Sequence, residues 1–511
     1  MNRRSLPTLM VLFGLFLAIL VALRPLMPLD ETRYLSVAWE MRLTGDIFHL
    51  TRNFEPYSHK PPLLFWAINL VWLVTGVCEY AARLVGPGFA VLCLWATARL
   101  ARALWTDRAD VTGVLVLAGF SLFAIYGSAT MFDAMLSFAV LIGVLCLWRA
   151  GQVGGGVRDW ALLGLALGFG VLAKGPVVLL HLLPMALLIR LWEEEHAPIA
   201  LRLKGLAVAL AVGLAVVALW LVPTLVTADA AFRHELLWTQ SVARMQGGLR
   251  HDRPFWFLLA LLPLLLFPWG WIPGFWRALP SAVRGDRAMR FLAIWVVSAP
   301  VLFSLIVSKQ AHYLLPELPA VALMVGRIIG AGAVRRVSFA PWAGLLAGLL
   351  FLLLPLLPAM GLPPELTPGM LAASGVALMV LSVLALRLSV VAGHLLLGMG
   401  LVAVLHLLGA TSGVFAEFDA RAMVGALPRP AAGLAVIGMP YNAELNFLAR
   451  LDAPVALPED EAALIAWAAA HPEGKIFGPL GQSLITSLPQ AQIRFNGRQL
   501  GIWPSEAVAG N

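Results

Sequence analysis

Charged side chains are scarce in this 511-residue chain, where they make up 13% of the residues while hydrophobic residues make up 60%. An average soluble domain carries about 25% charged residues, so the composition excludes an ordinary soluble protein. It also excludes a disordered chain, because disorder requires low hydrophobicity and high net charge. Together with a mean hydropathy of +0.85, this composition predicts a polytopic membrane protein.

Cysteines and several familiar motifs are also scarce or missing. The three cysteines, Cys78, Cys93 and Cys146, lie in or beside apolar runs without metal-ligand spacing, so we expect them to pack in the core and form no disulfide framework. The sequence has no phosphate-binding glycine loop, no Gly-x-Ser-x-Gly, no His-Glu-x-x-His and no solenoid repeat. No basic run is interleaved with aromatics, so the net charge of +8 indicates cytoplasmic loops and no nucleic-acid partner.

Long apolar runs fill most of the chain up to residue 411. The first, residues 6–23, follows Arg3 and Arg4 and lacks a small-residue cleavage site, so it resembles an anchoring helix more than a signal peptide. Further runs suited to spanning about 30 Å of hydrocarbon lie near residues 80–103, 110–127, 131–149, 160–173, 176–192, 205–227, 254–276, 289–307, 313–331, 340–358, 368–387 and 390–411. The prediction is an all-α membrane domain of about 13 transmembrane helices plus juxtamembrane helices.

The apolar stretch 61–76 has two interpretations, because it is short and begins with two prolines. A span there would place Arg3 and Arg4 opposite the later basic connectors, against the positive-inside rule. An interfacial helix keeps the N-terminus cytoplasmic and the C-terminus external. The external side of the membrane domain then receives three of the chain's five lysines and three acidic residues: Lys60, Lys174, Lys309, Asp30, Glu31 and Asp133.

The composition changes after residue 412, where charged residues, Gly and Pro punctuate shorter elements. We expect a membrane domain over residues 1–412 and a small periplasmic α/β domain over residues 413–511. Within the small domain, residues 433–438, 475–477 and 492–495 are predicted strands. Residues 442–450 and 460–470 are predicted amphipathic helices.

Two aspartates at predicted helix starts are candidate catalytic residues. Asp30 follows the first helix directly, and it is compatible both with an N-cap of a helix over 31–43 and with a catalytic carboxylate. Asp133 begins a later helix, where a carboxylate also suits the helix dipole. Either residue alone is explained by helix capping.

The external lysines stand at restricted positions. Lys60 precedes Pro61-Pro62, and Lys174 precedes Gly175-Pro176. Taken singly, Lys60, Lys174 and Lys309 each fit an anchor whose ammonium group reaches the membrane interface. Together on one side with two aspartates, they favour a common site for an anionic group.

Six motifs in order then carry a family resemblance. They are Asp30-Glu-x-Arg33-Tyr34, Lys60-Pro-Pro, Asp133, Lys174-Gly-Pro, Arg253-Pro-Phe-Trp256 with Pro268-Trp269 beyond it, and Lys309-x-x-His312-Tyr313-Leu-Leu-Pro316. Over residues 1–330 the chain resembles the aminoarabinose transferase family. That family belongs to the GT-C polyprenyl-phosphate-sugar glycosyltransferases and is related to the protein O-mannosyltransferases.

The resemblance implies transfer of a sugar from a polyprenyl (undecaprenyl) phosphate to an acceptor at the periplasmic face. Lipid A is the first candidate for this acceptor, and the transfer is expected to invert the anomeric configuration of the sugar. It implies a general-base role for Asp30 and an orienting role for Asp133. It implies that the donor phosphate and sugar are bound by Arg33, Tyr57, Lys60, Lys174, Arg244, Lys309 and Tyr313. Cations there would stabilise the charge that develops on the departing phosphate.

The chain departs from the family pattern at a position linked to metal binding. His59 stands where members have Glu before Lys-Pro-Pro, and Ser241 stands where members have His before a basic residue. Because zinc needs several N, S or carboxylate ligands, we expect no metal and no other cofactor.

Alternative functions are transfer to another glycan or to protein, and transport of a lipid-linked sugar. A transporter is expected to have repeated halves and charges near the midplane, whereas the charges here cluster on one predicted side. The expected location is the bacterial inner (plasma) membrane, with membrane lipids as further partners.

Overall fold

A computed structural model describes residues 5–105, 109–239, 252–332, 337–357, 362–425, 427, 433–481, 485 and 487–508. It divides into two compact units. The first comprises Met1–Val21, Ser58–Leu64 and Arg83–Leu408, and the second comprises Ala22–Tyr57, Phe65–Ala82 and Gly409–Asn511. The second unit therefore groups two early segments with the tail. The domain boundary at residues 412/413 remains a prediction from composition.

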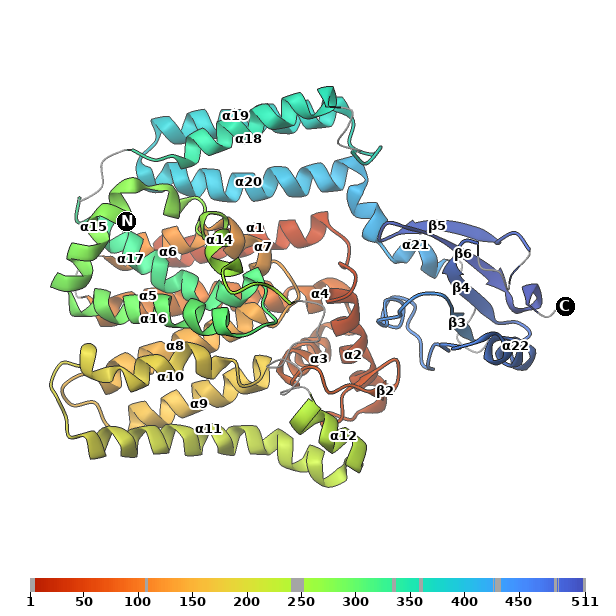
Figure 1. The fold of residues 1–511 in the computed structure, drawn as a ribbon, viewed down its shortest axis with the longest axis horizontal. Helices are drawn as coiled ribbons and strands as arrows, with labels where there is room; N and C mark the ends of the chain where they lie inside the picture. The colour runs from red at the N-terminus through yellow and green to blue at the C-terminus, as the bar shows by residue number, and fades with distance from the viewer. Residues whose placement is uncertain are drawn as a thin grey trace. The chain divides into compact units, whose positions relative to one another are not determined.

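The first unit is helical, and Figure 1 shows many of its helices running alongside one another. Its elements, with α1 and α20 continuing into the second unit, are α1 (Ser5–Leu23), α5 (Val85–Leu104), α6 (Ala109–Ala118), α7 (Ser121–Gly127), α8 (Asp133–Ala150), α9 (Val157–Lys174), α10 (Val178–Leu187), η1 (Ile189–Leu191), α11 (Ile199–Thr227), α12 (Ala230–His234), the π-helix η2 (Glu235–Thr239), α14 (Phe257–Leu265), η3 (Trp269–Trp271), α15 (Pro273–Gly285), α16 (Arg287–Leu305), η4 (Ala311–Glu317), α17 (Leu318–Gly330), α18 (Ala340–Leu353), η5 (Leu354–Leu356), α19 (Pro368–Arg387) and α20 (Val390–Ser412).

Each predicted apolar run contains helix, which confirms a mostly helical polytopic membrane protein. Within the described residues, 8 helices are long and apolar enough to cross a membrane. Other runs are divided, as at Gly119, where the run 110–127 becomes α6 and α7. The backbones of Gly119 and Gly398 approach so closely that a Cβ on Gly398 would lie 1.9 Å from the Gly119 carbonyl oxygen. The count of thirteen spans remains a prediction.

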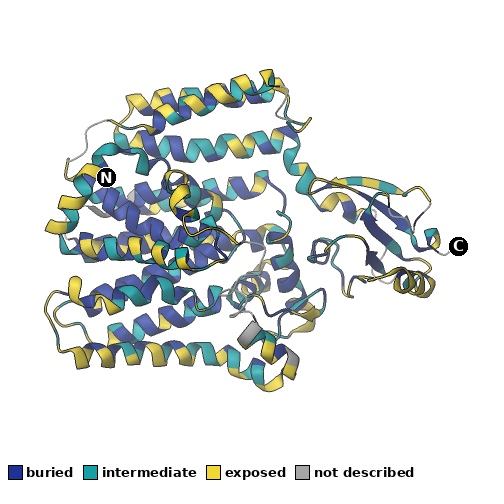
Figure 2. Cartoon of the chain, viewed as in Figure 1, coloured by how far each residue is buried: buried dark blue, intermediate teal, exposed yellow. Residues whose placement is uncertain are grey.

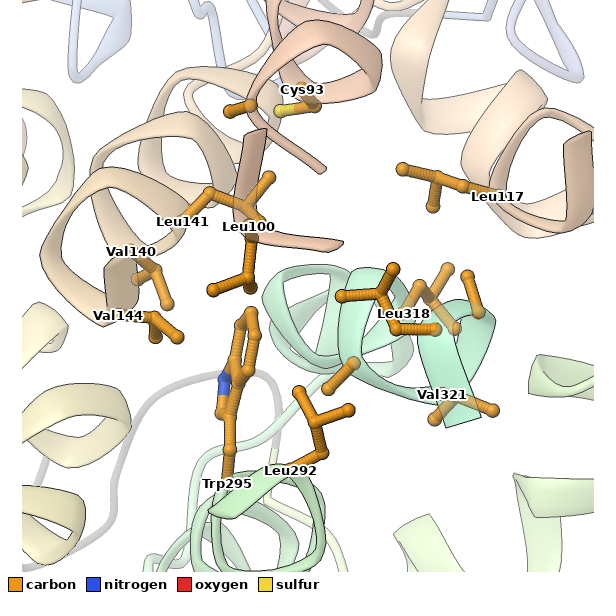
Figure 3. Close-up of a cluster of buried hydrophobic side chains, with 14 of the residues drawn as sticks. Cys93, Leu100, Leu117, Val140, Leu141, Val144, Leu292, Trp295, Leu318 and Val321 are labelled. Atoms are coloured by element: carbon orange, nitrogen blue, oxygen red, sulfur yellow. The ribbon is translucent and has the colours of Figure 1, made fainter. Parts of the chain in front are cut away.

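Apolar side chains and small residues pack the first unit. Figure 3 shows Trp295 of α16 among aliphatic side chains of neighbouring helices, including Leu100 and Val144, and all three are fully buried. Glycines let α9 and α11 approach closely, since a Cβ on Gly168 would lie 2.5 Å from Val216 Cβ and one on Gly205 2.3 Å from Trp160 Cε2. Such small-residue contacts are the usual means of helix association in lipid. The far side of α11 stays exposed (Figure 2), as expected for a lipid-facing helix.

The second unit combines helices with a small sheet. Its elements are α2 (Glu31–Thr44), β1 (Thr51–Arg52), β2 (Glu55–Pro56), α3 (Leu63–Thr75), α4 (Glu79–Arg83), η7 (Val414–Phe418), α21 (Arg421–Val424), β3 (Leu434–Val436), α22 (Glu461–Ala470), β4 (Lys475–Pro479), β5 (Ala491–Phe495), β6 (Arg498–Pro504) and η9 (Ser505–Ala507); α3 and α4 each begin or end in the first unit. The sheet has the order β3-β4-β6-β5, with β3 parallel to β4 and the other pairs antiparallel.

The sequence predicts most of the tail's elements. β3, β4, β5 and α22 confirm the predicted strands and the helix over 460–470, while β6 was not predicted. The helix predicted over 442–450 is wrong, because this segment forms successive turns with positive φ at Ala443 and Arg450. Side chains there compete with helical backbone bonds: the Asn442 amide N–H donates to Glu444, and the Leu445 amide N–H donates to Tyr441.

Polar side chains of α2 bind the tail within the second unit. The Glu40 carboxylate is buried and accepts hydrogen bonds from the amide N–H groups of Asn53 and Phe54, each at 2.8 Å, and from Asn446. Asn53 in turn exchanges two hydrogen bonds with the backbone of Val455. Burial raises the pKa of Glu40. The early segment 22–57 and the tail are therefore parts of one folded body.

The indole of Trp72 in α3 adds an apolar contact to that body. It stacks on the ring of Phe447, with centroids 5.6 Å apart and planes at 3°. Trp39 of α2 donates its indole N–H to the Leu451 carbonyl. α3 therefore buries one face against the tail, while Leu70, Leu73 and Val74 on its other face are exposed.

Candidate active site

Asp30 is the centre of a polar cluster at the start of α2, in the second unit. Its Oδ1 accepts hydrogen bonds from Arg33 at 2.6 Å and from the Tyr34 hydroxyl at 2.8 Å. Asp30 stands at the N-cap position, but its side chain makes no capping hydrogen bond. Asp30 therefore occupies the N-cap position without capping the helix, because its carboxylate binds side chains and not the backbone N–H groups of α2.

Neighbouring residues hold this start of α2 in place. Arg24 forms a buried, two-pronged ion pair with Glu31, whose Oε2 also accepts the Met27 amide N–H. Leu29, immediately before Asp30, has a φ of 75°, a conformation that is strained for a branched residue. Strain next to a candidate carboxylate is typical of functional sites.

Two groups around Asp30 keep fixed protonation states. Burial raises the pKa of Tyr34 well above its ordinary value, so its hydroxyl remains a donor. Burial alone would lower the pKa of Arg33, but Tyr57, Tyr34 and Asp30 outweigh that effect and raise it. Arg33 is therefore a permanent cation beside the Asp30 carboxylate.

Asp133 and Lys174 form the centre of a second cluster, in the first unit. Lys174 Nζ donates to Asp133 Oδ1 at 2.5 Å, and His312 Nε2 lies 3.9 Å from the same oxygen. Lys174 Nζ also lies 4.8 Å from the ring centroid of Tyr313. The corner after Lys174 is made by Gly175, whose φ of 84° ends α9. Segments far apart in sequence thus surround one buried carboxylate.

Lys60 lies beside this cluster. Its Nζ is 5.5 Å from the ring centroid of Phe132, the residue before Asp133. Lys60 is half-buried and its charge acts on Asp133. The structure therefore brings Lys60, Asp133, Lys174 and Tyr313 together, while their placement on the external side stays a prediction.

Lys309 has different surroundings. It is buried, and its Nζ donates to the carbonyls of Ser304 at 2.9 Å and Pro254 at 3.4 Å. These bonds stabilise the corner before η4. Its role as a donor ligand, like the roles of the other candidate residues, stays a prediction. Arg244 and Ser241 lie outside the described residues.

Two further residues belong to these clusters and were missing from the predicted set. His312 stands in the Lys309-x-x-His312-Tyr313 motif, and Tyr34 stands in the Asp-Glu-x-Arg-Tyr motif. The signal in the sequence that could have indicated them is their position in these motifs, close to the predicted site residues. Only the fold shows that both side chains reach an aspartate.

Residues available to a metal near His59 are few. His59 Nε2 lies 4.0 Å from Glu235 Oε1, and both side chains are about half exposed. Ser58 donates its hydroxyl to the same Glu235 oxygen. Within the described ranges, no group of three His, Cys, Asp or Glu side chains is arranged to hold a metal. One imidazole and one carboxylate do not fit zinc, which takes three or four protein ligands.

Comparison with solved structures defines the class of fold. ArnT from Cupriavidus metallidurans in the apo state has a TM-score of 0.79 and 18% identity, with 99% of each chain covered. ArnT from the same organism bound to undecaprenyl phosphate has a TM-score of 0.78 and 19% identity, with 98% of each chain covered. The predicted GT-C fold, with its small C-terminal sheet, is therefore confirmed as ArnT-like.

Sequence comparison then gives the particular relatives. A family model described as dolichyl-phosphate-mannose-protein mannosyltransferase matches residues 59–222. The undecaprenyl phosphate-alpha-4-amino-4-deoxy-L-arabinose arabinosyl transferase of Pseudomonas paraeruginosa is 31% identical over 341 residues, covering 64% of this chain and 60% of that protein. The corresponding transferase 2 of Proteus mirabilis is 27% identical over 308 residues, covering 58% and 54%. The chain thus spans about 60% or less of these curated relatives, and the resemblance expected from its motifs is confirmed.

Proposed function

We propose that this chain is a membrane glycosyltransferase that moves 4-amino-4-deoxy-L-arabinose from undecaprenyl phosphate to lipid A. The relatives' names supply the donor, and the resemblance supplies the acceptor. The observation that carries the proposal is that the matched residues 59–222 contain Lys60 and the buried Lys174–Asp133 pair. These residues have the chemistry that a lipid phosphate requires.

The reaction is a direct displacement at the anomeric carbon. An acceptor oxygen forms a bond to that carbon as the bond from carbon to the phosphate oxygen breaks, and the bonding electrons leave with undecaprenyl phosphate. Asp30 takes the acceptor's proton, because only its Oδ1 is used by Arg33 and Tyr34 and its side chain is 45% exposed. A single displacement inverts the anomeric configuration.

The cations stabilise the leaving group. The phosphodiester carries one negative charge, and departure makes the phosphate dianionic. Lys60 and Lys174 lower the barrier to the extent that they bind this second charge more tightly in the transition state than in the ground state. Asp133 holds Lys174 in place meanwhile.

The proposed membrane topology has thirteen spans, a cytoplasmic N-terminus and a periplasmic tail, in the bacterial inner membrane. It is supported by α3, which at 13 residues and about 1.5 Å per residue is too short for about 30 Å of hydrocarbon. A Cys78→Ser background leaves Cys93 and Cys146, which are buried. In that background, Glu55→Cys and Ser487→Cys should react with an impermeant thiol reagent in intact spheroplasts, and Ser281→Cys should not. Reaction of Ser281→Cys alone would overturn the orientation.

Transfer to another glycan or to protein is the competing enzyme function, and transport of the lipid-linked sugar is the competing class. The test is incubation of purified protein with labelled undecaprenyl-phosphate aminoarabinose and lipid A, followed by mass analysis of lipid A. Label on lipid A supports the proposal. Label that stays on the donor, or that crosses a proteoliposome membrane unchanged, contradicts it.

A further inference from the structure

A second buried pair of ionisable groups lies in the first unit. His181 of α10 and Glu317 of η4 are both buried, with His181 Nδ1 2.5 Å from Glu317 Oε1. The His181 ring also packs against Phe303, with centroids 5.5 Å apart. His181 Nε2 and Glu317 Oε2 have no hydrogen-bond partner among the described residues. The described residues therefore give this pair one hydrogen bond and one aromatic contact.

The His181–Glu317 pair lies close in the chain to residues of the Asp133–Lys174 cluster. α10 follows the corner Lys174-Gly175-Pro176, and η4 carries His312 and Tyr313 ahead of Glu317. The His181–Glu317 bond therefore joins the segment after Lys174 to the segment that packs around Lys174. Phe303 continues this contact, since its ring lies 5.5 Å from both the His181 and the Tyr313 ring centroids.

Stability alone is a poor explanation for such a pair. Replacing a buried ion pair by apolar residues of similar volume is often neutral or stabilising, because both groups must be desolvated. Ionisable groups inside a membrane protein are costly and are functional by default. Here Glu317 belongs to the same short helix, η4, as His312, whose Nε2 lies 3.9 Å from the Asp133 oxygen that binds Lys174.

We propose that His181 and Glu317 are positioning residues that fix η4 against α10 and thereby aim Lys174 and Tyr313 at the donor phosphate. This inference rests on the proposed function for its substrate. Without the bond, η4 and the corner after Lys174 are free to shift against each other. A displacement of about 1 Å in a positioned group can cost 10²-fold in rate.

The test is a mutant cycle on the purified full chain, with kcat and KM measured for labelled undecaprenyl-phosphate aminoarabinose at saturating lipid A. We expect His181→Ala and Glu317→Ala each to lower kcat by about tenfold or more with KM changed by less than about threefold, because aim matters most in the transition state. The double variant should be no slower than the slower single variant, because both substitutions remove one bond. Glu317→Gln keeps an acceptor oxygen and should recover most of the rate.

A matched control separates aim from general loosening. Glu193 is another buried carboxylate of the first unit, which binds Arg202 at 2.9 Å and also Arg190 and His196. Glu193→Ala should lower the melting temperature in detergent by an amount similar to Glu317→Ala, yet leave kcat per folded protein within about twofold, since a structural pair acts on stability alone. Equal kcat losses in both variants, or additive losses in the cycle, would overturn the positioning role.

The same experiment distinguishes failure of the two proposals. A wild-type protein that neither transfers the sugar nor binds undecaprenyl phosphate contradicts the proposed function, and the positioning role with it. An active wild type with normal kcat in Glu317→Ala contradicts the positioning role alone. Should Glu317→Ala fail to give a single peak in detergent, Glu317→Leu, which fills the space but cannot accept the bond, replaces it in the cycle with His181→Ala. A normal kcat in Glu317→Leu, or losses that add in the double variant, would contradict the positioning role.

Discussion

The clusters around Asp30 and Asp133 use the same residue type in opposite settings. The Asp30 side chain is 45% exposed and uses one oxygen for Arg33 and Tyr34, whereas Asp133 is 1% exposed and bonds a lysine. A half-exposed carboxylate is accessible to an incoming acceptor, whereas a buried carboxylate paired with a cation is suited to holding that cation in place. Environment, more than residue identity, separates a proton acceptor from a positioning group.

The largest effect is expected at the exposed aspartate. Asp30→Asn keeps the shape and the hydrogen bonds of Oδ1 but removes the proton acceptor. The rate of sugar transfer should fall by about 10²-fold or more, because general-base catalysis usually contributes a factor of about that size. Binding of undecaprenyl phosphate should remain, as measured by a thermal shift. Retention of more than about a tenth of the wild-type rate would contradict the general-base role.

The buried aspartate should respond differently, through stability as well as rate. Asp133→Asn leaves Lys174 without its carboxylate, and breaking a buried pair costs about 3–5 kcal/mol. We expect a lower melting temperature in detergent together with slower transfer. The double variant Asp133→Leu with Lys174→Met should recover the melting temperature while staying inactive. Recovery of activity in that double variant would show that the pair is structural.

A smaller effect is expected from changes that keep the charge of the lysines. Lys60→Arg and Lys174→Arg retain a cation but replace a compact ammonium with a planar fork, so turnover should fall clearly, and Lys→Ala at either position should lower it further. The rate is measured with a purified donor and normalised to protein recovered as a single peak. Near-normal rates in all four variants would mean that these lysines only anchor helices at the interface.

The smallest effect is expected from metal removal. Because His59 and Glu235 supply too few ligands, treatment with EDTA should leave the transfer rate within about twofold, since catalytic zinc takes three protein ligands. Addition of Zn²⁺ or Mn²⁺ afterwards should restore nothing. A large loss with EDTA that Mn²⁺ reverses would assign a metal site that includes residues outside the described ranges.

The sequence predicts those features that depend on local pattern. The apolar runs are long enough to predict the helices. The Gly-Pro pair after Lys174 predicts a break between two helices, and the structure has one there, where Gly175 has a φ of 84°. For Lys174 and Asp133 the sequence predicts only that both lie on the same side of the membrane. It does not predict their bond, because the two residues are 41 positions apart. Motif order indicated the resemblance to the aminoarabinose transferases, which composition could not.

What the sequence could not predict depends on distant contacts. Nothing near Glu40 in the sequence indicates that its carboxylate binds Asn446, 406 residues away. The segment 442–450 has helical periodicity, but side-chain bonds such as Tyr441 to Asn446 favour turns instead. The sequence does not predict the pair His181–Glu317, because a single His in an apolar run gives no local indication of its partner.

The bonds from Glu40 and Trp72 to the tail also have a consequence for biosynthesis. The segments 22–57 and 65–82 leave the ribosome well before their partners Asn446, Phe447 and Val455, which are made 375 to 406 residues after the residues that they contact. At about 5–20 residues per second, the interval is roughly 20 to 80 s. During that time a carboxylate and an indole that end in a folded interior remain without their final partners. The newly made chain therefore has a period in which chaperones and membrane proteases can act on it, and this period ends only after Val455 has been made.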